Sequence, residues 1–93
     1  MTLSTESRPR LAHKARLRFD RKTGRHLLLY PEKGMVLNPT GADVLQLCTG
    51  EHTVAAIIDH LATRYAQSAT AVETEVLGFL KAMKDRGLVG TDE

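Results

Sequence analysis

The hydrophobic pattern of this 93-residue chain changes its period once, at Asn38-Pro39. Before that point three short segments carry strand-like patterns, residues 16–19, 26–30 and 35–37. After it, apolar residues recur at helical spacing in three further segments. Strands followed by helices are typical of an α+β domain, because a small sheet needs helices to cover its apolar face.

The three strand segments are joined by short turns at residues 20–24 and 31–34. Sequential strands with such connections form an antiparallel meander. The last segment, residues 35–37, is short and follows Gly34, so we expect it at an edge of the sheet. An edge strand leaves backbone amides and carbonyls unpaired, and an extended peptide can complete them by strand addition.

The second part of the chain predicts a bundle of three helices. We expect Thr40 to cap the first, Thr53 to cap the second, and a T-x-x-E capping box at Thr70 to begin the third. Gly50 and Gly87 follow the first and third helices, where glycine commonly adopts the left-handed conformation. Two short helices and a longer one beside a three-stranded meander predict a winged helix-turn-helix-like arrangement.

The length favours a single domain, which we place at residues 15–90. Residues 1–14 show no period and predict a flexible basic arm, and residues 91–93 form a polar tail. Charge is uneven: the first 33 residues carry nine Lys or Arg against three acids, whereas residues 34–93 carry four against eight. The basic end is therefore suited to an acidic partner.

The residues that carry chemistry elsewhere do not form a recognisable site here. Four histidines and the single cysteine, Cys48, lack any metal-binding spacing, and no nucleophile or phosphate-binding motif occurs. Cys48 falls on an apolar helical stripe, where a thiol acts as a small hydrophobe. The chain is therefore expected to bind no metal or cofactor and to catalyse no reaction by itself.

Compartment and membrane association follow from the same composition. One cysteine rules out a framework of internal disulfides, which fits a reducing environment. Apolar runs are too short to cross a bilayer. We expect a cytoplasmic protein with no membrane partner.

A small winged-helix DNA-binding regulator is the alternative interpretation. Such a domain inserts a basic recognition helix into the major groove. Here the third helix begins with Glu73 and Glu75, which would repel phosphate, so the charge pattern disfavours nucleic acid.

Specific residues favour one family. The chain reads L-L-Y-P-E-K-G at residues 28–34, V-L-N at 36–38, T-G-A at 40–42 and V-L-Q-L-C-T-G at 44–50, with V-L-G-F-L at 76–80 and G-L-V at 87–89. This run resembles the PqqD family of pyrroloquinoline quinone (PQQ) biosynthesis over roughly residues 9–90.

The resemblance implies a non-catalytic peptide chaperone. Members bind the leader part of the precursor peptide PqqA and present it to the radical S-adenosylmethionine enzyme PqqE. The leader adds as a strand beside the third strand, in a groove completed by the third helix. Carried over to this chain, the strand residues are Gly34, Met35, Val36, Leu37 and Asn38, and the helix residues are Val76, Phe79, Leu80, Met83 and Lys84.

Three points stay open at the level of sequence. Most of the apolar residues in this set also fit an ordinary core, with Met83 the best exception, because a flexible thioether suits an adaptable groove. The basic residues of the arm and first hairpin are the candidates for docking the enzyme: Arg8, Arg10, Arg16 and Arg18. A homodimer through the exposed strand edge or through exchange of the arm is also open.

Overall fold

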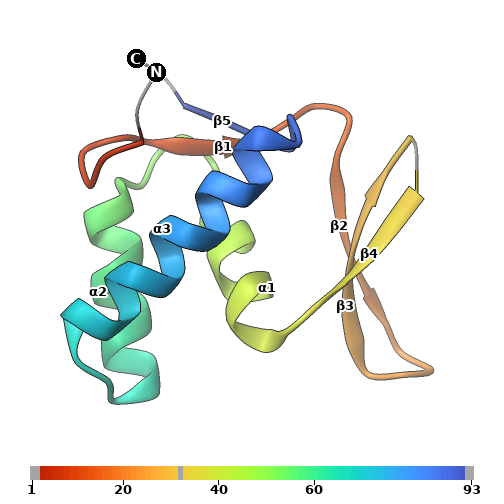
Figure 1. Cartoon of the computed structure of the whole chain (residues 1–93). Helices are drawn as coiled ribbons and strands as arrows, with labels where there is room; N and C mark the ends of the chain where they lie inside the picture. Colours follow the sequence, from red (N-terminus) through yellow and green to blue (C-terminus); the bar gives the residue numbers. More distant parts are fainter. Residues whose placement is uncertain (1–2, 32, 92–93) are drawn as a thin grey trace.

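The computed structural model describes residues 3–31 and 33–91. The elements are β1 (Pro9–Leu11), β2 (Arg16–Asp20), β3 (Arg25–Tyr30), β4 (Lys33–Leu37), α1 (Pro39–Gln46), α2 (Val54–Tyr65), α3 (Ala69–Asp85) and β5 (Val89–Thr91). The three helices lie together on one side and the sheet of β2, β3 and β4 stands on the other (Figure 1). The α+β class expected from the change of period is confirmed, with three antiparallel strands preceding three helices.

The three-stranded sheet has the order β2-β3-β4, and both pairings are antiparallel. Leu17, Leu28 and Met35 are directly opposite one another and lie on the face that packs against the core. We call this the inner face. The expected second turn is shorter than predicted, since Lys33 already pairs with Tyr30. Glu32 lies outside the described residues.

The core joins the helices to the inner face of the sheet. In α2 the buried side chains are Val54, Ile57, Ile58 and Leu61, spaced as one helical stripe. In α3 they are Val72, Val76, Leu80 and Met83. Both stripes follow the i, i+3, i+4 spacing, so burial of these faces holds α2 against α3.

Two of the expected helix caps are wrong. Asn38, not Thr40, caps α1: its side-chain oxygen accepts from the Gly41 amide at 2.7 Å. Pro39 then occupies the first helical position, where its fixed φ fits and its missing N–H costs nothing. Thr40 is already within the helix.

The third helix also begins earlier than expected. Ser68 caps α3 by accepting from the Ala71 amide at 3.3 Å, so Thr70 lies inside the first turn. The predicted cap Thr53 is confirmed by its bond from the Ala56 amide at 3.1 Å. Gly87, with φ of +73°, follows α3 as expected. Gly50 also has a positive φ, but it lies beyond the cap of α1 at Leu47.

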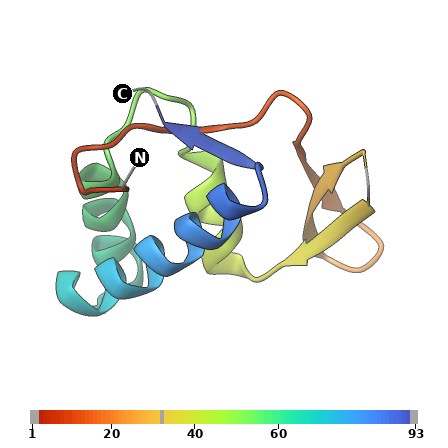
Figure 2. The same ribbon diagram turned by 45° about the horizontal axis from the view of Figure 1, so that its top comes forward.

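The segment expected to be a flexible arm contains a strand, which corrects that prediction. β1 pairs with β5 at the other end of the chain, and the two lie side by side above the helices (Figure 2). Backbone bonds continue the attachment: the Leu11 amide donates to the Cys48 carbonyl, and the Val54 amide donates to the Ser7 carbonyl. β1 has only three residues, one of them a proline, and so short a segment shows no hydrophobic period. The sequence pattern therefore did not predict this strand.

Parts of the expected arm and of the expected tail lie outside the described residues. Met1 and Thr2 of the expected arm, and Asp92 and Glu93 of the expected tail, are not among the described residues. Thr91, the first residue of that tail, belongs to β5. The arm, for which exchange between copies was left open, contains a strand that pairs with β5 of its own chain.

Candidate functional site

The expected edge strand is at an edge. β4 pairs with β3 on one side, and no described strand pairs with its other side. In an antiparallel sheet alternate residues direct their N–H and C=O groups away from the neighbouring strand. β4 therefore presents a row of backbone donors and acceptors to an added strand.

A groove lies at the end of this strand. It has a volume of about 310 Å³ and runs between the start of α1 and the middle of α3. The residues that line it are Asn38, Thr40, Gly41, Val44, Glu75, Val76 and Phe79. The groove therefore extends from Asn38, the residue after β4, to α3.

The close approach of α1 and α3 at this groove depends on Gly41. A Cβ atom at Gly41 would lie 3.0 Å from Oδ1 of Asn38 and 3.1 Å from Cε1 of Phe79. The missing side chain thus lets the Phe79 ring pack against the first turn of α1. Phe79 stays half-buried and forms an apolar wall that a ligand can contact.

The five strand residues carried over from the resemblance differ in exposure. Gly34, Val36 and Asn38 are exposed, Met35 is half-buried, and Leu37 is buried in the core. Backbone pairing needs no exposed side chain, so all five positions are compatible with an added strand.

The helix residues divide more sharply. Val76, Leu80 and Met83 are buried in the core, while Phe79 and Lys84 are half-buried. Met83 is only 4% exposed, so its expected role as a groove residue apart from the core is wrong. Met83 lies on the buried stripe of α3 and belongs to the core cluster, which one sequence could not assign.

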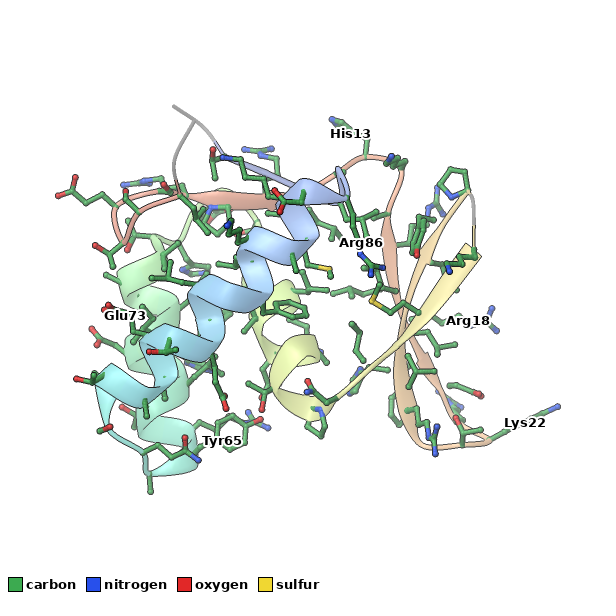
Figure 3. The ribbon with its side chains drawn as sticks, viewed as in Figure 1. His13, Arg18, Lys22, Tyr65, Glu73 and Arg86 are labelled. Atoms are coloured by element: carbon green, nitrogen blue, oxygen red, sulfur yellow. The ribbon has the colours of Figure 1, made fainter. Side chains whose placement is uncertain are left out.

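Two charged residues near the site were missed by sequence reasoning. Glu75 lines the groove near Asn38, although its place at the start of a helix had suggested only an effect of the helix dipole. Arg86, just after α3, lies between the helix and the sheet (Figure 3). An acid thus lines the groove near the middle of α3, and a base follows the C-terminal end of the same helix.

The four basic residues expected to dock an enzyme do not form one surface. Arg10 belongs to β1, and its guanidinium covers Gly50, where a Cβ would lie 2.5 Å from Nη2. Arg8 precedes the same strand. Arg16 and Arg18 lie on β2, and Arg18 points away from the helices (Figure 3). The structure therefore divides the predicted set between the β1–β5 pair and the three-stranded sheet.

The metal-ligand side chains and the thiol of Cys48 can be placed within the described residues. Residues 3–31 and 33–91 contain no cluster of three His, Cys, Asp or Glu side chains that could hold a metal ion. Cys48 is buried and its thiol donates to the Val44 carbonyl at 3.2 Å. Burial raises the pKa of this thiol from 9.0 to about 12, so it is not a nucleophilic thiolate at neutral pH. Within the same ranges no helix is long and apolar enough to cross a membrane.

Comparison with known proteins decides the family. The family model described as coenzyme PQQ synthesis protein D (PqqD) matches residues 25–89. The chain belongs to the PqqD family. The resemblance read from the sequence is confirmed, and the matched range includes β3, β4 and all three helices.

Full-length relatives support the same assignment to PqqD. A PqqA binding protein of Rhodopseudomonas palustris (strain BisB5) is 38% identical over 89 residues, covering 96% of this chain and 87% of the relative. One from Methylococcus capsulatus is 30% identical, with 96% and 94% covered. A bifunctional coenzyme PQQ synthesis protein C/D of Methylorubrum extorquens is 33% identical over 78 residues, which are 84% of this chain and 21% of that protein.

A solved PqqD structure has the same fold. The PqqD truncation of Methylobacterium extorquens PqqCD, described as a functional and stand-alone recognition element for ribosomally synthesized and post-translationally modified peptides, superposes with a TM-score of 0.83. It is 30% identical in sequence, and the match covers 96% of this chain and 95% of that one.

Proposed function

We propose that this chain is a non-catalytic chaperone that binds the leader of the precursor peptide PqqA and presents it to the radical S-adenosylmethionine enzyme PqqE. The observation that carries the proposal is the unpaired edge of β4, which runs into a groove walled by Phe79. The PqqA binding proteins among its relatives support PqqA as the ligand.

Binding would proceed by strand addition. The leader would lie beside residues 34–38, and its backbone would complete the hydrogen bonds that β4 leaves open. Side chains on one face of the added strand would turn toward α3, where Phe79 offers an apolar contact and Lys84 a half-exposed amine. Glu75 in the groove and Arg86 just after α3 carry opposite charges, which would favour one direction of the peptide over the other.

The chain would contribute position rather than chemistry. A leader held on β4 raises the local concentration of the reacting peptide at the enzyme and fixes its register. The arrangement of α1–α3 with the β2–β4 sheet also supports the winged helix-turn-helix description. A DNA-binding role finds no support, because the groove-facing Glu75 and the neighbouring Glu73 oppose phosphate.

The strand-addition model is tested with two N-methylated versions of a synthetic PqqA peptide. One version carries N-methyl groups on the even-numbered residues of the bound segment and the other on the odd-numbered residues. Because alternate amides face β4, one version should lose binding and the other should keep it, as measured by calorimetry. Equal affinity of the two versions would rule out strand addition.

The location is tested separately by amide chemical shifts of the labelled protein during titration with the unmodified peptide. We expect the shifts to gather on residues 33–38 and on α3. Shifts confined to α2 or to the β1–β5 pair would place the peptide elsewhere, and shifts caused only by duplex DNA would favour the regulator.

A further inference from the structure

The sheet has a second, outward face whose composition the peptide site does not explain. The register places Arg18, Leu27 and Val36 directly opposite one another, and Arg16, Leu29 and Gly34 in the next row. These residues alternate with the inner-face residues and so point away from the core. We call the following set the outer face: Arg16, Arg18, Asp20, Arg25, Leu27, Leu29, Gly34 and Val36.

The centre of the outer face is apolar. Val36 is 56% exposed, Leu27 and Leu29 are half-buried, and none of the three belongs to the core or packs against it. A solvent-facing side of an antiparallel sheet is normally polar. Three adjacent branched apolar residues on such a face are typical of a surface that another protein covers.

The missing side chain of Gly34 keeps the apolar centre of the outer face flat. A Cβ atom at Gly34 would lie 3.0 Å from Cδ2 of Leu29, so the Leu29 side chain packs against Gly34. The result is a flat apolar area that extends from β3 to the free edge of β4.

Positive charge borders the apolar centre. Arg16, Arg18 and Arg25 are all exposed, and Arg18 projects outward in Figure 3. Asp20 shares the face, but its carboxylate accepts from the Lys22 amide at 3.1 Å and from the Thr23 hydroxyl at 2.9 Å. The acid is thus engaged by its own turn, and the face as a whole is cationic.

We propose that the outer face docks a protein surface with an apolar centre and a carboxylate-rich border, on the enzyme that receives the peptide. Charge complementarity favours this occupant. A second copy would bring arginines against arginines, and a nucleic acid would leave Leu27, Leu29 and Val36 without apolar contacts.

The inference rests on the proposed function only for the identity of the enzyme. It also implies that binding of the leader peptide and binding of the enzyme are coupled. A leader strand added beside β4 would extend the outer face by one strand. The docked enzyme would then contact alternate side chains of the leader as well as Val36. The peptide should therefore raise the affinity for the enzyme, and the enzyme should raise the affinity for the peptide by the same factor.

The test uses the full chain with purified PqqE, with and without PqqA peptide. The double variant Arg16→Glu/Arg18→Glu should weaken binding to the enzyme about tenfold or more, because two positive charges at the interface become negative. Leu27→Thr, which introduces a β-branched residue suited to a strand, should weaken it about threefold or more by removing apolar contact. Lys22→Glu, at the tip of the β2–β3 hairpin, is the matched control and should change it less than about twofold.

Peptide affinity is measured on the same variants and should be unchanged, so failure of the docking proposal is distinct from failure of the peptide proposal. Cross-saturation from PqqE to the labelled wild-type protein supplies a measurement that needs no variant, and it should mark β2, β3 and Val36. The proposal would be overturned if Lys22→Glu weakened enzyme binding as much as the double variant does, or if the outer-face variants lost peptide binding to the same extent as enzyme binding. Cross-saturation confined to the helices, or tighter binding of duplex DNA than of the enzyme, would also overturn it.

Discussion

The phenol of Tyr65, at the end of α2, donates a hydrogen bond to the carboxylate of Asp43 in α1. Arg64 reaches the same carboxylate oxygen, with its Nε at 3.3 Å. This pair fixes α1 against α2, and α1 supplies Gly41 and Val44 to the groove. A contact on the helical side thus sets one wall of the candidate site.

Tyr65→Phe tests that link. We expect a loss of about 0.5–1 kcal/mol in the free energy of unfolding, because one partly exposed hydrogen bond is removed while the ring stays. Urea unfolding measures it. Arg64→Gln is the control: its side chain is 58% exposed, and we expect an effect of less than about 0.5 kcal/mol. A larger effect of the arginine variant would contradict the assignment of the link to Tyr65.

The buried thiol of Cys48 predicts a pH dependence. Burial raises its pKa from 9.0 to about 12, so between these values the unfolded chain releases a proton that the folded chain retains. The contribution is complete below pH 9 and is lost as the pH rises. We expect stability to fall by roughly 1 kcal/mol between pH 8 and pH 10 from this group.

Unfolding of the wild type and of Cys48→Ala at the two pH values measures the thiol's share. The alanine variant is less stable at both, because a core side chain is shortened, but its loss between them should be smaller. Tyr65 has its pKa raised, first by its hydrogen bond to Asp43, and adds a loss of the same sign above about pH 10. Equal slopes for wild type and Cys48→Ala below that pH would refute the prediction.

Two glycines provide a matched pair. Gly41→Ala should destabilise the fold by about 1–3 kcal/mol, since the new Cβ meets Asn38 and Phe79 at the wall of the groove. Gly78→Ala, in α3 with nothing within 4 Å of its Cβ, should stabilise by about 0.5–1 kcal/mol through helix propensity. Thermal unfolding compares them, and peptide affinity should fall only for Gly41→Ala. Stabilisation by Gly41→Ala, or destabilisation by Gly78→Ala, would contradict the close packing at Gly41 and the open space at Gly78.

Two neighbouring acids test the charge of the groove. Glu75→Lys should weaken PqqA binding about threefold or more at low salt, because a groove-lining negative charge is replaced by a positive one. Glu73→Lys, outside the groove lining, should change it by less than about twofold. Calorimetric titration measures both. The prediction is wrong if the two variants have the same effect.

Local pattern was sufficient for much of this molecule. The period change at Pro39, the β-meander, the second helix cap at Thr53 and the left-handed Gly87 could all be predicted, because each depends on residues close together in the chain. The same holds for the edge position of β4, which follows from a short last strand in a meander. The family was recognisable from specific residues, above all those at 28–34 and 36–38.

Other features depended on contacts between distant residues. β1 is a strand only because β5, about eighty residues later, lies beside it. The cap of α1, in contrast, is local: Asn38 and Thr40 are both suitable cap residues, and the extended backbone at Asn38 directs its side chain to the Gly41 amide.

Tertiary packing also decided which residues of the candidate site are buried and which are exposed. Periodicity placed Val76, Phe79 and Met83 on α3, but packing against α2 and the sheet buried Val76 and Met83 and left Phe79 at the groove. The sequence by itself determined most of the elements, since periods and turns are local, and specific residues determined the family. Only the tertiary structure decided which charges and apolar residues share a surface, because a helix or strand acquires an inside and an outside when other elements pack on it.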